Sequence, residues 1–166
     1  LLIRVIIILL SNNNFMKIAS NCKNCVITIP NGPKKYINFS YSLARSFKFY
    51  NKSEEIDFYI VSDTDFTLPR DLKWVKKLIV SRELMGKGIE YKFRFNKIIP
   101  QANCLYIDCD SLVYDDLGEV FKTFENSSIN VIGIKATRDG EWGANVVDTC
   151  LQFDIRYLIR FCGAFY

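Results

Sequence analysis

The sequence predicts an α/β fold with a mainly parallel sheet, and two observations favour it. Strand-like and helix-like segments follow one another in the order β-α-β-β-α-β-α-β, which is typical of parallel-rich sheets. One buried strand also runs directly into two carboxylates, at the end where open α/β sheets place their ligands. The 166 residues, 49% hydrophobic and 14% aromatic, fit one domain and exclude a disordered chain.

The first half of the chain supplies three predicted strands and a helix. Residues 26–29 form a short β-branched run that Pro30 and Gly32 end, so we expect a strand and then a loop. Apolar residues recur at helical spacing over 36–50. Residues 56–61 and 74–80 are the second and third predicted strands.

The second half begins with a predicted helix over 92–99 that Pro100 ends. Residues 105–107 are apolar and predict a buried strand. Asp116 followed by Glu119 is a capping-box pattern, which predicts a helix running to residue 124. Residues 130–134 predict a further strand.

Asp108 and Asp110 directly follow the buried strand at 105–107. Two carboxylates this close repel each other, and burial without a partner would be costly. A hard divalent cation neutralises such a pair, and carboxylate oxygens are its preferred ligands. The sequence therefore predicts a Mn²⁺ or Mg²⁺ site on these two residues. The alternative is that both are ordinary loop carboxylates after a strand.

The run Leu-Tyr-Ile-Asp-Cys-Asp-Ser-Leu-Val at 105–113, followed by Asp-Leu at 116–117 and Val-Phe at 120–121, resembles the DxD motif region of nucleotide-diphospho-sugar transferases with the GT-A fold. The most similar group is glycosyltransferase family 8, which contains glycogenin-like and lipopolysaccharide galactosyltransferase-like enzymes. The resemblance covers residues 25–134. It implies a GT-A, Rossmann-like sheet with flanking helices, incomplete at the C-terminus, and a chain truncated at that end.

The resemblance also implies roles for individual residues. Asp108 and Asp110 would hold the metal, and Asp108 would also contact the ribose. Thr28 and Tyr36 match the strand and loop that hold uracil, and Lys92, sixteen residues before Asp108, matches a lysine near the nucleotide. Each of the last three also has a structural interpretation. Thr28 would fill a strand, Tyr36 would begin the core face of its helix, and Lys92 would be a surface lysine.

The function that the resemblance implies is a metal-dependent glycosyltransferase of the hexosyltransferase type. It would move a sugar from a nucleotide diphosphate donor, a UDP-sugar by resemblance, to an unidentified glycan, lipid or protein. Such enzymes take a third metal ligand, a histidine, from a later segment, and this sequence contains no histidine. The catalytic residues are not identified, and neither the sugar, the acceptor nor the stereochemical outcome follows from the sequence.

Two other functions fit the same residues. The Asp108 to Val113 segment also resembles the first motif of haloacid-dehalogenase-like phosphatases, in which Asp108 would be the phosphorylated nucleophile and Asp110 the general acid and base. About a hundred residues precede this segment, whereas that motif normally opens the catalytic domain. The non-enzymatic alternative is a truncated remnant that binds a nucleotide without catalysis.

Charge and cysteine content add weaker constraints. The net charge is +4, and nine basic residues fall within 70–97. This excess suits a diphosphate, but it suits a solvated basic face equally well. No basic and aromatic repeat indicates nucleic acid as a partner. Cys22 and Cys25 form half a zinc knuckle without a second CxxC, so we expect no structural zinc and a reducing compartment.

The first fifteen residues form an apolar and then polar leader. Residues 1–10 are apolar apart from Arg4 and too short to span a bilayer, which needs about 20 residues. The segment is either the remnant of a membrane anchor or an untranslated region before a start at Met16. We expect residues 16–166 to form one domain in the cytoplasm, with membrane anchoring through the leader as the alternative.

Overall fold

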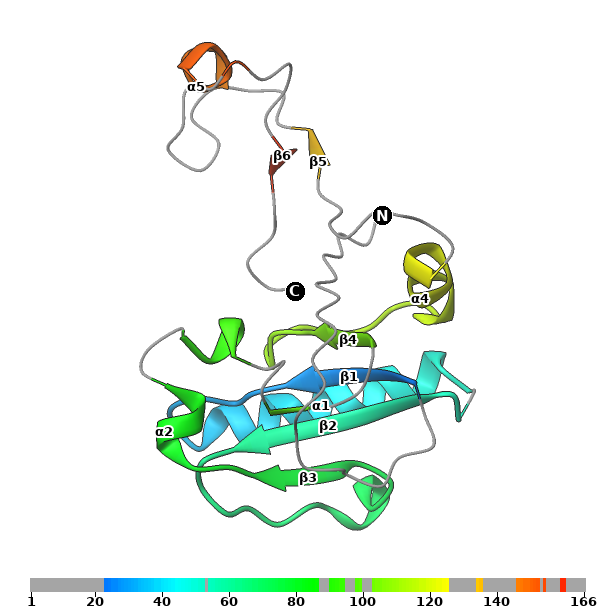
Figure 1. Ribbon diagram of the computed structural model, residues 1–166. Helices are drawn as coiled ribbons and strands as arrows, with labels where there is room; N and C mark the ends of the chain where they lie inside the picture. Colours follow the sequence, from blue (N-terminus) through cyan, green and yellow to red (C-terminus); the bar gives the residue numbers. More distant parts are fainter. Residues whose placement is uncertain are drawn as a thin grey trace.

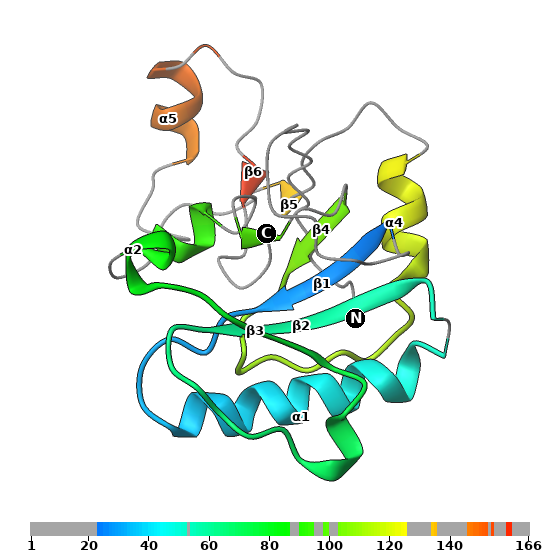
Figure 2. The same cartoon turned by 60° about the horizontal axis from the view of Figure 1, so that its bottom comes forward.

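The computed structural model describes residues 23–52, 54–86, 90–94, 98–99 and 103–125, with short pieces at 134–135, 146–152, 154 and 159–160. Its main body is a four-stranded sheet with a long helix packed along one face (Figures 1 and 2). The predicted leader at 1–15 lies outside the described residues. Within the described part of the chain, no helix is long and apolar enough to cross a membrane.

The four strands all run parallel, which confirms the predicted α/β class. They lie in the order β3-β2-β1-β4. Their bounds are β1 (Asn24–Thr28), β2 (Ile56–Ser62), β3 (Lys76–Ile79) and β4 (Asn103–Tyr106). In the register, Ile27 pairs with Tyr59 on one side and with Tyr106 on the other.

The order of the strands reverses beside β1. The chain leaves β1, passes through α1 (Lys35–Tyr50) and returns as β2 on one side, whereas β4 pairs with the other side of β1. In open parallel sheets the crevice outside the carboxyl ends of two such strands is where ligands bind. The sheet therefore has a topological switch point between β1 and β4.

Both faces of the sheet are buried, as expected for parallel strands. On the α1 face, the helix packs Leu43, Ala44 and Phe47 against Val26, Phe58 and Leu105. On the opposite face, Ile27, Tyr59 and Tyr106 pack with Met85, Ile98 and Ile99. The continuous apolar runs in β1 and β2 are explained by this two-sided burial, because successive strand residues point to opposite faces.

The remaining elements are short. They are η1 (Arg70–Leu72), α2 (Arg82–Met85), η2 (Glu90–Phe93), α4 (Gly118–Glu125), α5 (Val146–Gln152) and a separate antiparallel pair, β5 (Ile134–Lys135) with β6 (Ile159–Arg160). Four of these elements, η1, α2, α5 and β6, were not predicted from the sequence. Ser81 and Gly86 were the usable signals for α2, because Ser81 Oγ accepts a hydrogen bond from the Leu84 amide and Gly86 has a φ of +84°.

Three predicted boundaries differ from the structure. β3 begins at Lys76 and not at Trp74, because the Trp74 indole closes a turn by donating to the Asp71 carbonyl at 3.1 Å. The helix predicted at 92–99 begins as the 3₁₀ helix η2 at Glu90, and residues 95–97 lie outside the described part. Of the strand predicted at 130–134, only Ile134 is described, and it belongs to β5.

The predicted capping box at the start of α4 is only half correct. The Asp116 carboxylate accepts a hydrogen bond from the Gly118 amide at 2.8 Å, as a capping side chain does. The return bond from Glu119 is replaced, because the Asp116 amide donates to the Asp115 carboxylate and Glu119 pairs with Lys122 at 2.8 Å.

Two buried cysteines face each other across neighbouring strands. Cys25 on β1 and Cys104 on β4 are register partners, and their sulfur atoms are 2.9 Å apart as free thiols. Burial raises the pKa of the Cys25 thiol, and the contact with Cys104 raises it further. Cys25 is therefore an uncharged part of the core.

Much of the basic excess at 70–97 is used in ion pairs within the described residues. Lys76 binds Asp57 at 2.6 Å, Arg94 binds Glu90 at 2.6 Å, and Lys77 binds Asp65. These contacts favour the interpretation of a solvated basic face for this part of the segment.

The buried Asn51 links α1 to the loop that precedes α4. Its amide nitrogen donates to the Phe47 carbonyl at 3.0 Å, and its Oδ1 accepts from the Leu117 amide at 2.7 Å. We expect Asn51→Ala to lower the free energy of unfolding by about 1–3 kcal/mol, because the Leu117 N–H would lose its partner. Urea unfolding measures this loss.

Ser42→Ala is the matched control, because the Ser42 hydroxyl lies exposed on the same helix and makes only a 3.4 Å bond to the Asn38 carbonyl. An equal effect of the two substitutions would contradict the role assigned to Asn51.

Candidate functional site

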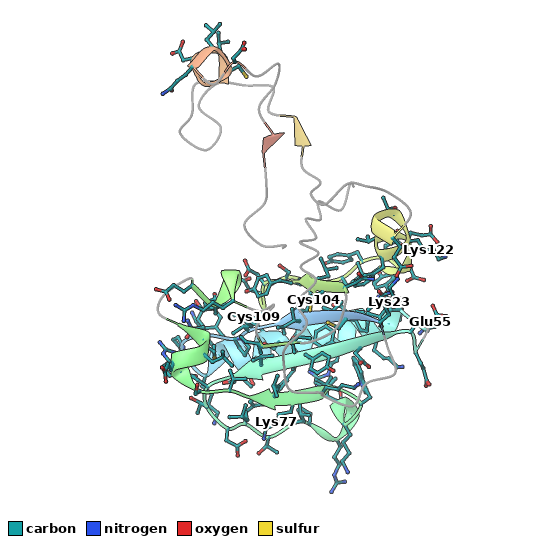
Figure 3. The ribbon with its side chains drawn as sticks, viewed as in Figure 1. Lys23, Glu55, Lys77, Cys104, Cys109 and Lys122 are labelled. Carbon is teal, nitrogen blue, oxygen red and sulfur yellow. The ribbon has the colours of Figure 1, made fainter. Side chains whose placement is uncertain are left out.

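The two predicted metal carboxylates lie on a tight turn at the end of β4. The Ser111 amide donates to the Asp108 carbonyl at 3.0 Å, which closes a β-turn of four residues. Asp108 is half-buried and Asp110 is exposed, whereas Cys109 between them is buried. Lys23 and Glu55, just before β1 and β2, lie at one end of the sheet, and Cys109 lies at the other (Figure 3).

A cavity of about 180 Å³ opens where this turn meets the end of β1. It is lined by Ile29, Asn31, Tyr36, Tyr91, Tyr106, Asp108, Cys109 and Asp110. Three of the site residues expected from the sequence, Tyr36, Asp108 and Asp110, thus come together at the switch point between β1 and β4. The two carboxylates face this cavity with aromatic rings around them.

A tyrosine hydroxyl holds one of the carboxylates. The Tyr106 hydroxyl donates to Asp108 Oδ1 at 2.6 Å, and the two side chains share a face because they are two residues apart on an extended segment. The Tyr91 ring lies 6.3 Å from the Tyr106 ring. Burial raises the pKa of Tyr106 far above its ordinary value, and the charge of Asp108 and hydrogen bonds to Asp108 and Tyr91 add to this. Tyr106 thus keeps its proton at physiological pH and acts as a hydrogen-bond donor.

Gly32 shapes the loop that brings Tyr36 to the cavity. Its φ of +123° is a conformation that favours glycine, and a Cβ there would lie 3.3 Å from the Tyr36 ring. Tyr36 is half-buried and belongs to neither core cluster, so it is not the first core residue of its helix. Its ring packs edge-on against Phe39, and the Lys35 ammonium lies 5.4 Å from the ring centre. An aromatic ring is therefore available at the cavity mouth.

A larger cleft of about 770 Å³ adjoins the first one along the carboxyl edge of the sheet. Asn31 lines both, and the larger one extends past the end of β2 through Asp63 and Thr64 to Arg82. The Arg82 guanidinium donates to Asp63 at 2.6 Å and to the Asn31 side chain at 3.1 Å. The hydrogen bond from Arg82 lowers the pKa of the Asp63 carboxyl, so this pair is charged at neutral pH.

Two expected site residues are not part of either cavity as described. Thr28 is fully buried, and its hydroxyl has no hydrogen-bond partner among the described residues, yet it lines neither cavity. Lys92 lies on η2, next to the cavity residue Tyr91, but its side chain is outside the described part. Their roles stay predictions.

The site offers two carboxylates for a metal. In the part of the chain that is described, no group of three or more acidic, cysteine or histidine side chains is placed to hold one. A hard cation fits the donor set if other oxygen atoms, from a diphosphate or water, complete its shell. Asp108 and Asp110 facing one small cavity are compatible with that arrangement.

Sequence reasoning missed several residues that line these cavities. Tyr106 had a local signal, because a residue two positions before Asp108 on a strand shares its face. Asn31 and Gly32 follow the first strand as a turn pair, which marks the loop but not its partner. Tyr91 and Arg82 carried no signal, because only the folded chain brings η2 and α2 to the carboxyl edge of the sheet.

Protein-family models and curated proteins were both compared with the chain, and neither comparison finds a match.

Proposed function

We propose that the chain is a metal-dependent glycosyltransferase with a GT-A-type fold similar to family 8, acting on a nucleotide diphosphate sugar and preferentially a UDP-sugar. The observation that carries this is the position of Asp108 and Asp110, on a turn at the topological switch point and facing one cavity with Tyr36. Open parallel sheets bind nucleotides at this position.

The proposal assigns a task to each part of the site. Asp108 and Asp110 would hold Mn²⁺ or Mg²⁺, and Asp108 would also contact the ribose. When bound, the ion would stabilise the departing nucleoside diphosphate as a Lewis acid. Lys92 would add a positive charge near the phosphates, and the Tyr36 ring would stack on the base.

The neighbouring cleft offers room for the nucleoside. Its volume of about 770 Å³ is within the usual range of ligand pockets, and it meets the carboxylate cavity at Asn31. A base near Tyr36 would lie between the two cavities, with the diphosphate toward Asp108. Thr28 lies on the strand before this loop, and its side chain is buried. It would therefore affect the position of the base only indirectly, through the residues next to it in the chain.

Isothermal titration of UDP into the chain, with Mn²⁺ or with EDTA, tests the proposal. We expect saturable binding with Mn²⁺ that becomes at least roughly 100-fold weaker with EDTA, because diphosphate oxygens and carboxylates share the ion. Equal binding under both conditions would exclude the metal role. No binding by a chain that circular dichroism shows to be folded would overturn the proposal.

Beryllofluoride with Mg²⁺ separates a transferase from the phosphatase that resembles the same segment. A phosphatase would trap it on Asp108, and a transferase would not. Retention of beryllium by the chain, and its loss in Asp108→Ala, would reject the transferase.

A further inference from the structure

We propose that Tyr106 is a positioning residue for the metal site, whose hydroxyl holds the Asp108 carboxylate in the orientation that receives the cation. This inference rests on the proposed function, because it assigns a second layer of support to the same carboxylate. The contact that carries it is the 2.6 Å bond from the Tyr106 hydroxyl to Asp108 Oδ1.

The position of Tyr106 separates the task of its ring from that of its hydroxyl. Only 1% of the residue is exposed, and its ring belongs to the core cluster around Ile27 and Met85. A phenylalanine would fill the same space. The hydroxyl reaches out of this core to the cavity, where its single hydrogen is donated to the carboxylate.

Tyr106 is also held rigidly, which a positioning residue requires. Tyr106 is the last residue of β4 and pairs in register with Ile27 of the central strand. Asp108, by contrast, lies on a turn just beyond the sheet. The hydroxyl therefore ties the Asp108 carboxylate on the turn to the fixed geometry of the sheet.

Tyr91 extends this support to η2. It hydrogen-bonds to Tyr106, and both side chains line the cavity. Because the Tyr106 hydrogen is donated to Asp108, a bond from the Tyr91 hydroxyl would end on a Tyr106 lone pair. These contacts run from Tyr91 through Tyr106 to Asp108. They join η2 and β4 to the turn at residues 108–111, which we call the acidic turn.

Tyr106→Phe in the full chain tests the proposal, with Mn²⁺ alone and Mn²⁺ with UDP as the probes. Hydrogen-bond partners of metal ligands typically contribute 10- to 100-fold to metal affinity, so we expect Mn²⁺ binding to weaken by roughly that factor. The UDP affinity measured in EDTA and the midpoint of urea unfolding are expected to equal those of the control variant, Tyr59→Phe.

Tyr59→Phe is the matched control. It removes a buried tyrosine hydroxyl from the same face of the sheet, on β2, which lies two strands away from β4 and its carboxylates. Its Mn²⁺ affinity is expected to equal that of the wild type. Equal Mn²⁺ affinity in Tyr106→Phe and wild type would overturn the proposal, and so would equal losses in both variants.

The electron paramagnetic resonance spectrum of Mn²⁺ at saturation provides a readout that a purely structural role would not change. In Tyr106→Phe we expect broader lines than in the wild type, because an Asp108 carboxylate without this hydrogen bond would give a wider mixture of coordination geometries. Identical spectra at saturation would reject the positioning role.

Tyr91→Phe keeps the proposal testable if Tyr106→Phe fails to fold. It removes the hydroxyl one step further from Asp108, so a loss of roughly two- to tenfold is expected, the range of one neutral hydrogen bond. An unchanged Mn²⁺ affinity would then overturn the proposal. If the wild-type chain binds UDP without any dependence on Mn²⁺, or binds neither, the proposed function itself fails, and the inference fails with it.

Discussion

Replacing Asp110 with alanine is expected to abolish Mn²⁺-dependent binding of UDP, with an affinity loss of at least about 100-fold. This loss corresponds to about 2.8 kcal/mol at 1.4 kcal/mol per tenfold change. The physical reason is that Asp110 supplies one of the two carboxylates at the cavity, and a lone carboxylate neutralises and orients the cation poorly. Asp110 is exposed, so its loss should not unfold the chain.

Isothermal titration with and without EDTA measures the effect, and circular dichroism verifies the fold. Asp115→Ala is the matched control, because Asp115 is an exposed carboxylate in the following loop that lines neither cavity. The Asp115 carboxylate accepts a hydrogen bond from the neighbouring Asp116 amide at 2.8 Å and does not face the cavity. Mn²⁺-dependent binding retained by Asp110→Ala, or lost equally in Asp115→Ala, would remove Asp110 from the site.

Phe47→Ala is expected to lower the free energy of unfolding by about 3–5 kcal/mol, the usual cost of deleting a buried aromatic side chain. Phe47 projects from α1 into the core, where its ring centre lies 5.1 Å from that of Phe58 and 6.1 Å from that of Trp74. The substitution leaves a cavity between the helix and β2, and the tryptophan loses its stacking partner. A loss of this size is a large share of the stability of a small domain.

Urea unfolding followed by tryptophan fluorescence measures this change, since Trp74 contacts the deleted ring. Phe49→Ala is the control on the same helix. Phe49 is 67% exposed and contacts Tyr50 and Lys52, so the expected change is within about 0.5 kcal/mol. Equal losses in the two variants would show that α1 does not pack on the sheet through Phe47.

The two experiments together separate the site from the scaffold. α1 supplies Phe47 to the core, and side chains of the same helix hold the loop that follows the acidic turn. Ser46 Oγ accepts from the Val113 amide at 2.9 Å, and Asn51 accepts from Leu117. A destabilised helix would thus disturb the loop as well as the core, whereas Asp110→Ala is expected to act on the proposed metal site alone.

Most of the sheet was predictable because its signals are local. Short apolar runs bounded by polar or turn-forming residues marked β1, β2 and β4, and the helical recurrence from Tyr36 marked α1. The failures occurred where a local pattern competes with tertiary contacts. Trp74 was predicted to begin the third strand, but its indole closes a turn against Asp71.

The candidate site divides in the same way. The acidic turn was visible because Asp108 and Asp110 are adjacent to a buried strand. The roles of Thr28 and Tyr36 came from resemblance, and the structure separates the two residues, with Tyr36 at the cavity and Thr28 buried in the sheet. Whether a residue near a strand end is exposed depends on which face of the sheet its side chain occupies. A single β-branched run does not indicate that face.

The α/β class, the approximate strands and the acidic pair were predictable, because each depends on residues next to one another in the chain. The pairing of β4 with β1, which brings Tyr36, Tyr91 and Tyr106 around Asp108, is visible only in the folded chain. These two strands are about eighty residues apart in the chain, and their pairing depends on burying both faces of the sheet at once. Such burial is a property of the whole chain, so local periodicity does not predict it.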